Sequence, residues 1–125
     1  MYMTLCRLAA LASLALFVLA RPSDSLAEVR VALIIGNSAY QKAPTLLNTL
    51  NDSSDIAASL ARLGFAVSRI ENGTHDQMRR GLLEFSHRAR GSAMAVVFFA
   101  GHGMEVGGEN WLIPVDAALK TDVDI

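Results

Sequence analysis

The chain has 125 residues, of which 52% are hydrophobic and 18% charged, and this balance excludes an intrinsically disordered protein. Its 11 basic and 12 acidic residues give a net charge of −1 without a basic stripe, so no nucleic-acid partner is expected. The single cysteine, Cys6, excludes a disulfide framework and a multi-cysteine zinc site. The length suits one small domain.

Residues 1–27 have the features of a signal peptide. A weakly basic start leads into the apolar run Leu8–Ala20, which a polar segment ends. As a helix this run would span about 20 Å, less than the roughly 30 Å of a bilayer core. We predict cleavage after Ala27, with a cut after Ala20 or an uncleaved anchor as alternatives. The domain is therefore expected to be exported, periplasmic or extracellular, to meet the membrane only through its leader, and to lose Cys6 on cleavage.

The first half of the remaining chain, residues 28–125, predicts a strand, a helix and a strand. The apolar run Arg30–Gly36 is typical of a strand covered on both faces of a parallel sheet. A helix is predicted from Asn51, which would cap it, to Gly64, a left-handed stop. Phe65–Ile70 alternates as a second strand. The predicted apolar face of the helix comprises Ile56, Leu60 and Leu63.

The second half predicts a helix, a strand and a hairpin. Thr74 and Gln77 form a capping box that begins the helix, which ends near Gly91. Met94–Ala100 is a third apolar strand, and Val106–Ile113 has glycines at the turn of a small hairpin. The predicted inner face of the helix comprises Met78, Leu82, Phe85 and Ala89. This order predicts an α/β fold with right-handed crossovers, helices on the faces of a parallel sheet, and the third strand at an exposed edge.

Two loops are expected at the carboxyl edge of this sheet, where open parallel sheets bind ligands. No dinucleotide-binding, P-loop or serine-hydrolase motif occurs in the chain. His102, between two glycines after the third strand, can act as a general base, and the N–H of Gly103 beside it as an oxyanion donor. The alternative is a loop histidine held by local hydrogen bonds.

Other titratable residues carry weaker signals. A metal site of His102, Glu105 and Asp116 would match no strong ligand spacing. His75 and His87 are expected to be solvated surface residues. No cofactor or metal is predicted.

Ordered segments of the chain closely resemble the caspase-like cysteine peptidases (peptidase C14), particularly their bacterial metacaspase-like branch. The resemblance runs from Val29 to about Ala117 and implies the three-layer caspase-hemoglobinase fold with a mostly parallel sheet, of which residues 28–125 would be the N-terminal part. Whether calcium is required stays open. The segments that carry the resemblance are Arg30–Asn37 with Tyr40, Leu50–Asp52, Leu63–Phe65, Val96–Gly103 and Trp111–Asp116.

The resemblance implies a role for four residues in cleaving a polypeptide substrate. His102 would activate a cysteine and protonate the leaving amine, and Gly103 would supply the oxyanion N–H. Asp52 would help form the pocket for a basic P1 side chain, so that cleavage follows Arg or Lys. Asn37 would line the same edge. The alternatives are a helix residue that favours the dipole for Asp52 and a loop turn for Asn37.

The nucleophile is the feature that this sequence lacks. In the family, a cysteine follows the next parallel strand in an Asp-x-Cys segment, whereas Cys6 precedes the first strand. Loss of a nucleophile costs on the order of a million-fold in rate, so we expect this chain alone to be inactive and to be part of a truncated peptidase. Its missing half would come from the rest of the gene or from a separate chain. The alternative is an inactive exported binding or regulatory half-domain that offers its open sheet edge.

Overall fold

The computed structural model describes residues 28–118, so the predicted leader lies outside the described residues. No helix within this part of the chain is both long and apolar enough to cross a membrane. The elements follow the predicted order of strand, helix, strand, helix, strand and hairpin, which confirms the α/β class. They are β1 (Arg30–Gly36), α2 (Thr49–Arg62), β2 (Ala66–Glu71), α3 (His75–Ala89), β3 (Met94–Ala100), β4 (Gly103–Val106) and β5 (Glu109–Leu112).

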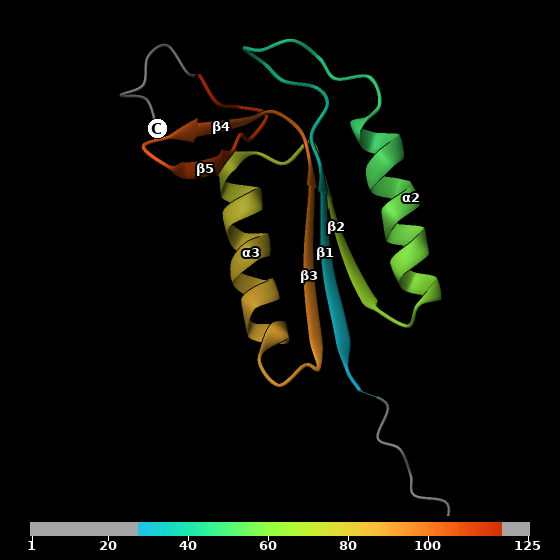
Figure 1. Ribbon diagram of the computed structural model, residues 1–125. Helices are drawn as coiled ribbons and strands as arrows, with labels where there is room; N and C mark the ends of the chain where they lie inside the picture. Colours follow the sequence, from blue (N-terminus) through green and yellow to red (C-terminus); the bar gives the residue numbers. More distant parts are fainter. Residues whose placement is uncertain (1–27, 119–125) are drawn as a thin grey trace, which may run out of the picture.

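The three long strands form a parallel sheet in the order β2-β1-β3. Central β1 pairs with β2 from Val31 opposite Ala66 and with β3 from Arg30 opposite Met94. Helices α2 and α3 cover opposite faces of this sheet, which gives three layers (Figure 1). The predicted parallel sheet with helices on its faces is therefore confirmed.

The core follows the two-residue period of β1. Alternate β1 side chains meet α3 on one face and α2 on the other, as expected for a strand whose successive side chains point in opposite directions. Full burial of one such aliphatic side chain stabilises the fold by roughly 1.5 to 3 kcal/mol. The α3 side contains Val31, Leu33, Ile35, Met78 and Phe85, and the α2 side contains Ala32, Ile34 and Ala57.

Helix α2 begins earlier than predicted. Asn51 lies inside the helix, which starts at Thr49, and Asn48 in the N-cap position makes no side-chain cap bond. The hydroxyl of Thr49 instead donates to the carbonyl oxygen of Asn37 at 2.9 Å and ties the helix start to the end of β1. The cap predicted at Asn51 is wrong because the Asp52 N–H already bonds to the Asn48 carbonyl oxygen at 2.9 Å, so the first turn starts before Asn51. The predicted stop at Gly64 is confirmed by its φ of +83°.

The face of α2 that meets the sheet also differs from the prediction. Ile56 is 36% exposed and Leu63 is 63% exposed, whereas Ser53 and Ala57 are buried. A Cβ atom on Gly36 would lie 2.4 Å from Ser53 Oγ, so the backbones of β1 and α2 approach closely there. Of the predicted residues, Leu60 packs against the core on this face. The closest contact is made by small residues, which the apolar period of the sequence did not indicate.

Helix α3 and strand β3 follow the sequence closely. The Thr74 side chain accepts from the Gln77 N–H and the Gln77 side chain accepts from the Thr74 N–H, so the predicted capping box is present. Met78 and Phe85 are buried, and Leu82 is 37% exposed. Because β3 has a strand neighbour on one side only among the described residues, Val97 is 45% exposed.

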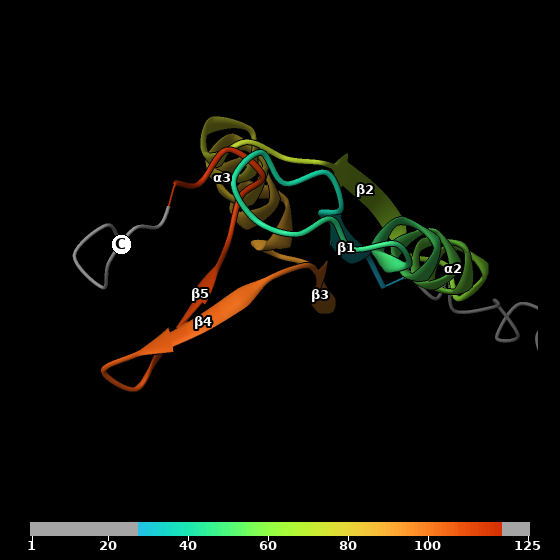
Figure 2. The same cartoon turned by 90° about the horizontal axis from the view of Figure 1, so that it is seen from above.

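The hairpin of β4 and β5 extends away from the sheet beyond β3 (Figure 2). Gly107 and Gly108 form its turn with φ values of +61° and +85°, which favour glycine. Strand β4 begins at Gly103, so part of the predicted loop around His102 is a strand. His102 is left as the residue between β3 and the hairpin.

Candidate active site

The loops at the carboxyl edge of the sheet pack into a third apolar cluster. Its buried members are Tyr40 from the loop after β1 and Ile113 and Val115 from the segment after β5. The chain leaves β1 toward α2 on one face and enters β3 from α3 on the other. This makes the space beyond the ends of β1 and β3 the switch point at which open sheets bind ligands. The structure thus places His102 beside the loop after β1 at that point.

Asn37 joins three segments beneath this edge. Its side chain is 0% exposed. The amide nitrogen donates to the Ile113 carbonyl oxygen at 3.1 Å, and the amide oxygen accepts from the Gly73 N–H at 2.9 Å. Asn37 therefore has no exposed atom with which to contact a substrate, and the predicted lining role is not available to it. Its amide holds together the loops that carry the site.

The loop after β1 is closed by hydrogen bonds at its two ends. Asn72, in the left-handed region with φ +48°, accepts from the backbone N–H groups of Ser38 and Ala39, both at 2.9 Å. The Ser38 hydroxyl donates to the Leu46 carbonyl oxygen at 2.6 Å. These bonds fix the segment that presents Tyr40 to His102.

The imidazole of His102 has its tautomer fixed by a backbone partner. Its Nε2 lies 2.8 Å from the carbonyl oxygen of Pro44. Because a carbonyl oxygen only accepts hydrogen bonds, Nε2 must carry the proton and Nδ1 of the neutral ring keeps its lone pair. No described residue hydrogen-bonds to Nδ1. His102 is therefore arranged to accept a proton at Nδ1.

The N–H of Gly103 points away from the hairpin partner. The Ile113 N–H donates to the His102 carbonyl oxygen at 3.1 Å, so these two residues form a hydrogen-bonded pair. Pair types alternate along an antiparallel ladder, and Gly103 opposite Leu112 is thus a non-hydrogen-bonded pair. The exposed Gly103 N–H can bind an oxyanion formed next to His102.

Asp52 occupies the first turn of α2, near the carboxyl edge of the sheet. Its side chain is exposed, and within residues 28–118 it has no hydrogen-bond or ion-pair partner. The negative charge suits the positive end of the helix dipole, which was the alternative interpretation of this residue. The same exposed carboxylate is available to a cationic ligand.

Asp116 caps a helix in this structure. Its Oδ1 accepts from the His75 N–H at 2.8 Å at the start of α3. No group of three or more potential ligand side chains lies together in the described part of the chain, so the weak combination of Asp116 with His102 and Glu105 gains no support. His75 and His87 are exposed, as predicted.

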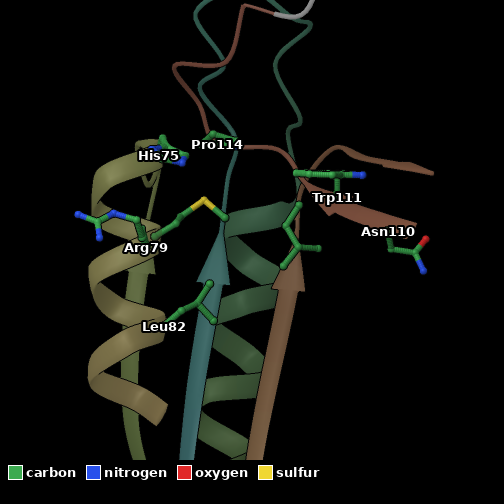
Figure 3. Close-up of a pocket in the computed structure, with 8 residues that line it drawn as sticks. His75, Arg79, Leu82, Asn110, Trp111 and Pro114 are labelled. Atoms are coloured by element: carbon green, nitrogen blue, oxygen red, sulfur yellow. The ribbon is translucent and has the colours of Figure 1, made fainter. Parts of the chain in front are cut away.

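A pocket of about 310 Å³ opens on the α3 side of the molecule. It is mostly apolar, with α3 on one side and β5 on the other (Figure 3). None of Asn37, Asp52, His102 or Gly103 lines it, so the pocket is separate from the candidate active site. Its lining residues are His75, Met78, Arg79, Leu82, Asn110, Trp111, Leu112 and Pro114.

Comparisons with known proteins bear on the domain as a whole. The family model of the caspase domain, peptidase C14, matches residues 29–124. The chain belongs to the caspase-domain family. This caspase-family chain is 35% identical over 92 residues to human mucosa-associated lymphoid tissue lymphoma translocation protein 1, and 34% identical over 92 residues to the mouse homolog. The match covers 74% of the chain and 11% of either relative, so the chain spans about a ninth of their length.

The resemblance to caspase-like peptidases is thus confirmed, and with it the caspase-like α/β fold. The sequence predicts His102 and Gly103 as site residues of this caspase-family domain, but it gives no signal for the groups that hold them. Pro44 acts through its carbonyl oxygen, which every residue possesses, so its side chain gave no signal. Asn72 fixes the neighbouring loop through hydrogen bonds to residues 33 and 34 positions away, which the local sequence does not indicate.

Proposed function

We propose that this caspase-family chain supplies the base and the oxyanion donor of a cysteine endopeptidase. The observation that carries the proposal is the His102 imidazole. Its Nε2 is bonded to the Pro44 carbonyl oxygen, Nδ1 has no partner among the described residues, and the next residue, Gly103, does not use its N–H in the hairpin ladder. Nδ1 takes the proton of the cysteine thiol, and the thiolate attacks the carbonyl carbon of the peptide bond. Gly103 binds the resulting oxyanion, and His102 protonates the leaving amine as the C–N bond breaks and a thioester remains. Water then hydrolyses the thioester, which releases the carboxylic acid and restores the thiol.

The thiolate in this proposal comes from outside the 125 residues. Cys6 is the single cysteine of the sequence and lies 24 positions before Arg30, where β1 begins. The leader in which it lies supports export of the domain to the periplasm or the extracellular space. The chain by itself is therefore expected not to hydrolyse peptides. The first check is the reading frame beyond Ile125, where an apolar strand followed by Asp-x-Cys is expected.

The assay uses peptide amides with Arg or Lys at P1. We expect no hydrolysis by the 125-residue chain, and hydrolysis by a gene product or assembly that contains the cysteine. His102→Ala should lower kcat/KM of the complete form at least about a thousandfold, because it removes the base of a nucleophile-base unit. The exposed His75→Ala variant is the control. Hydrolysis that survives His102→Ala, or that the 125-residue chain shows with Cys6→Ser, would contradict the proposal.

A basic P1 preference, as in the metacaspase-like branch, is the finer part of the proposal. It is supported by the exposed and unpartnered carboxylate of Asp52 in the first turn of α2. A guanidinium or ammonium group of the substrate would pair with this carboxylate.

The preference can be tested in the complete form with matched substitutions in α2. Asp52→Asn should lower kcat/KM for an Arg-P1 peptide by about 30-fold or more, since one partner of a charge pair is removed. The control is Asp55→Asn, which removes an exposed carboxylate from the same helix. Equal effects of the two substitutions, or no effect of Asp52→Asn, would show that Asp52 only favours the helix dipole.

A non-catalytic binding module is the second candidate. It is supported by the outer edge of β3, which has no strand partner within residues 28–118, and by the half-exposed side chains Met94 and Val97 on this strand. Unpaired edges of this kind accept an added strand from a partner. Absence of an Asp-x-Cys segment over a long stretch downstream of Ile125 would favour this function over the peptidase.

A further inference from the structure

Tyr40 lies buried against the candidate base, with 8% of its surface exposed. Its hydroxyl accepts from the His102 N–H at 2.8 Å and donates to the Ile113 carbonyl oxygen at 3.2 Å. In a regular hydrogen-bonded pair the His102 N–H would donate to Ile113 directly. The Tyr40 hydroxyl thus bridges the His102 N–H and the Ile113 carbonyl oxygen, which would otherwise bond to each other. The second bond of the pair is direct, from the Ile113 N–H to the His102 carbonyl oxygen at 3.1 Å.

The ring of Tyr40 also packs on the imidazole. The two ring centroids lie 4.5 Å apart with an interplanar angle of 58°, a tilted contact of the kind that aromatic pairs favour. Pro44, which accepts from Nε2, belongs to the same loop. One loop therefore holds the backbone of His102, one face of its ring and one of its two nitrogens.

Gly101 leaves room for this arrangement. A Cβ atom at position 101 would lie 2.5 Å from the Tyr40 hydroxyl oxygen and 2.6 Å from Cζ of Phe99, distances that no real Cβ tolerates. Because residue 101 is glycine, the Tyr40 hydroxyl can approach the backbone N–H of His102. Burial raises the pKa of Tyr40 above its ordinary value of 10.0, and the hydrogen bond from the His102 backbone opposes this in part. The hydroxyl therefore keeps its proton at neutral pH and can donate to Ile113.

We propose that Tyr40 is the positioning residue of the candidate active site. Its hydroxyl fixes the backbone of His102, and its ring fixes the imidazole plane, so that Nε2 stays on the Pro44 carbonyl and Nδ1 remains the proton acceptor. The catalytic meaning of this role rests on the proposed peptidase function. The positioning itself is a property of the described chain and can be measured without activity.

The test uses nitrogen-15 NMR of the 125-residue chain, with the His102 signals assigned by a His102→Gln variant. In the wild type we expect the Nε2-protonated tautomer and a protected His102 amide. A ring that averages between tautomers, or an Nδ1-protonated ring, overturns the proposal without any variant.

Tyr40→Phe keeps the ring and removes the hydroxyl. We expect hydrogen exchange of the His102 amide to become about tenfold faster relative to β1 amides, because one hydrogen bond is lost. The Nε2-protonated signal should weaken, because the released backbone of His102 lets Nε2 leave the Pro44 carbonyl oxygen. The control is Ser92→Ala, which removes a hydroxyl-to-carbonyl bond to Ala89 at the opposite end of the sheet. His102 signals that respond alike in both variants overturn the proposal. Loss of peptidase activity plays no part in this readout, so a failure of the proposed function is seen separately.

Discussion

Replacing Asn37 with alanine should produce one of the largest losses of stability of any single substitution in this domain. The fully buried amide bonds to the carbonyl oxygen of Ile113 and the N–H of Gly73. Alanine leaves the buried Gly73 N–H without its partner and opens a small cavity. We expect the free energy of unfolding to fall by about 2 to 4 kcal/mol, a large part of the roughly 5 to 15 kcal/mol of a small domain.

Urea unfolding followed by circular dichroism measures this loss. The matched control is Asn48→Ala, because Asn48 is an exposed asparagine whose side chain makes no cap bond. It should change the free energy of unfolding by less than about 0.5 kcal/mol. Similar values for the two variants would show that the amide of Asn37 does not hold the loops together.

A methyl group on Gly36 should be almost as damaging. Its Cβ would lie 2.4 Å from Ser53 Oγ, 2.9 Å from Ser53 Cβ and 3.2 Å from the Thr49 carbonyl oxygen. Ser53 is buried and short, so it cannot swing aside, and α2 must move away from β1. We expect Gly36→Ala to lower the free energy of unfolding by about 2 to 3 kcal/mol through overpacking.

A double-mutant cycle isolates the cause of that loss. Ser53→Gly removes both serine atoms from the contact, so the combined variant should be more stable than the sum of the two single changes by about 1 kcal/mol or more. Gly103→Ala is the control, because its Cβ would meet nothing closer than the Trp111 carbonyl oxygen at 3.6 Å. Additive effects of the two substitutions would contradict a direct collision between Gly36 and Ser53.

The parts of the fold that the sequence predicted well depend on local chemistry. The apolar run of β1, the capping box at Thr74 and the glycine turn of the hairpin all lie within short windows, and each is present. The predicted start of α2 was wrong because the helix begins at Thr49 without a side-chain cap bond, so the cap signal of Asn51 did not mark it, and Thr49 is bonded to the carbonyl oxygen of Asn37, 12 residues away. The predicted inner face of α2 was right at Leu60 and wrong at Ile56 and Leu63, because the close approach at Gly36 favours small residues there.

In the candidate site, too, the local signals were readable from the sequence and the distant contacts were not. His102 stood out because glycines flank it at the end of an apolar strand, a pattern confined to a few residues. The partners of its backbone and ring are Tyr40 and Pro44, which are 62 and 58 residues distant. The structural role of Asn37 could not be predicted either, because its amide bonds to Ile113, which the fold brings close from a distant part of the chain.

The hydrogen bonds around the site also bear on the order in which the domain folds. Asn37 to Ile113 spans 76 residues, Tyr40 to His102 spans 62 and His75 to Asp116 spans 41. Contacts that close such long loops form late, because the chain entropy must be lost before they add stability. The pairing of β1 with β3 closes an equally long loop, since Arg30 lies opposite Met94, so it is expected to form late as well. The carboxyl edge is held by side-chain hydrogen bonds between loops and not by a strand ladder, so we expect it to open before the sheet in local unfolding.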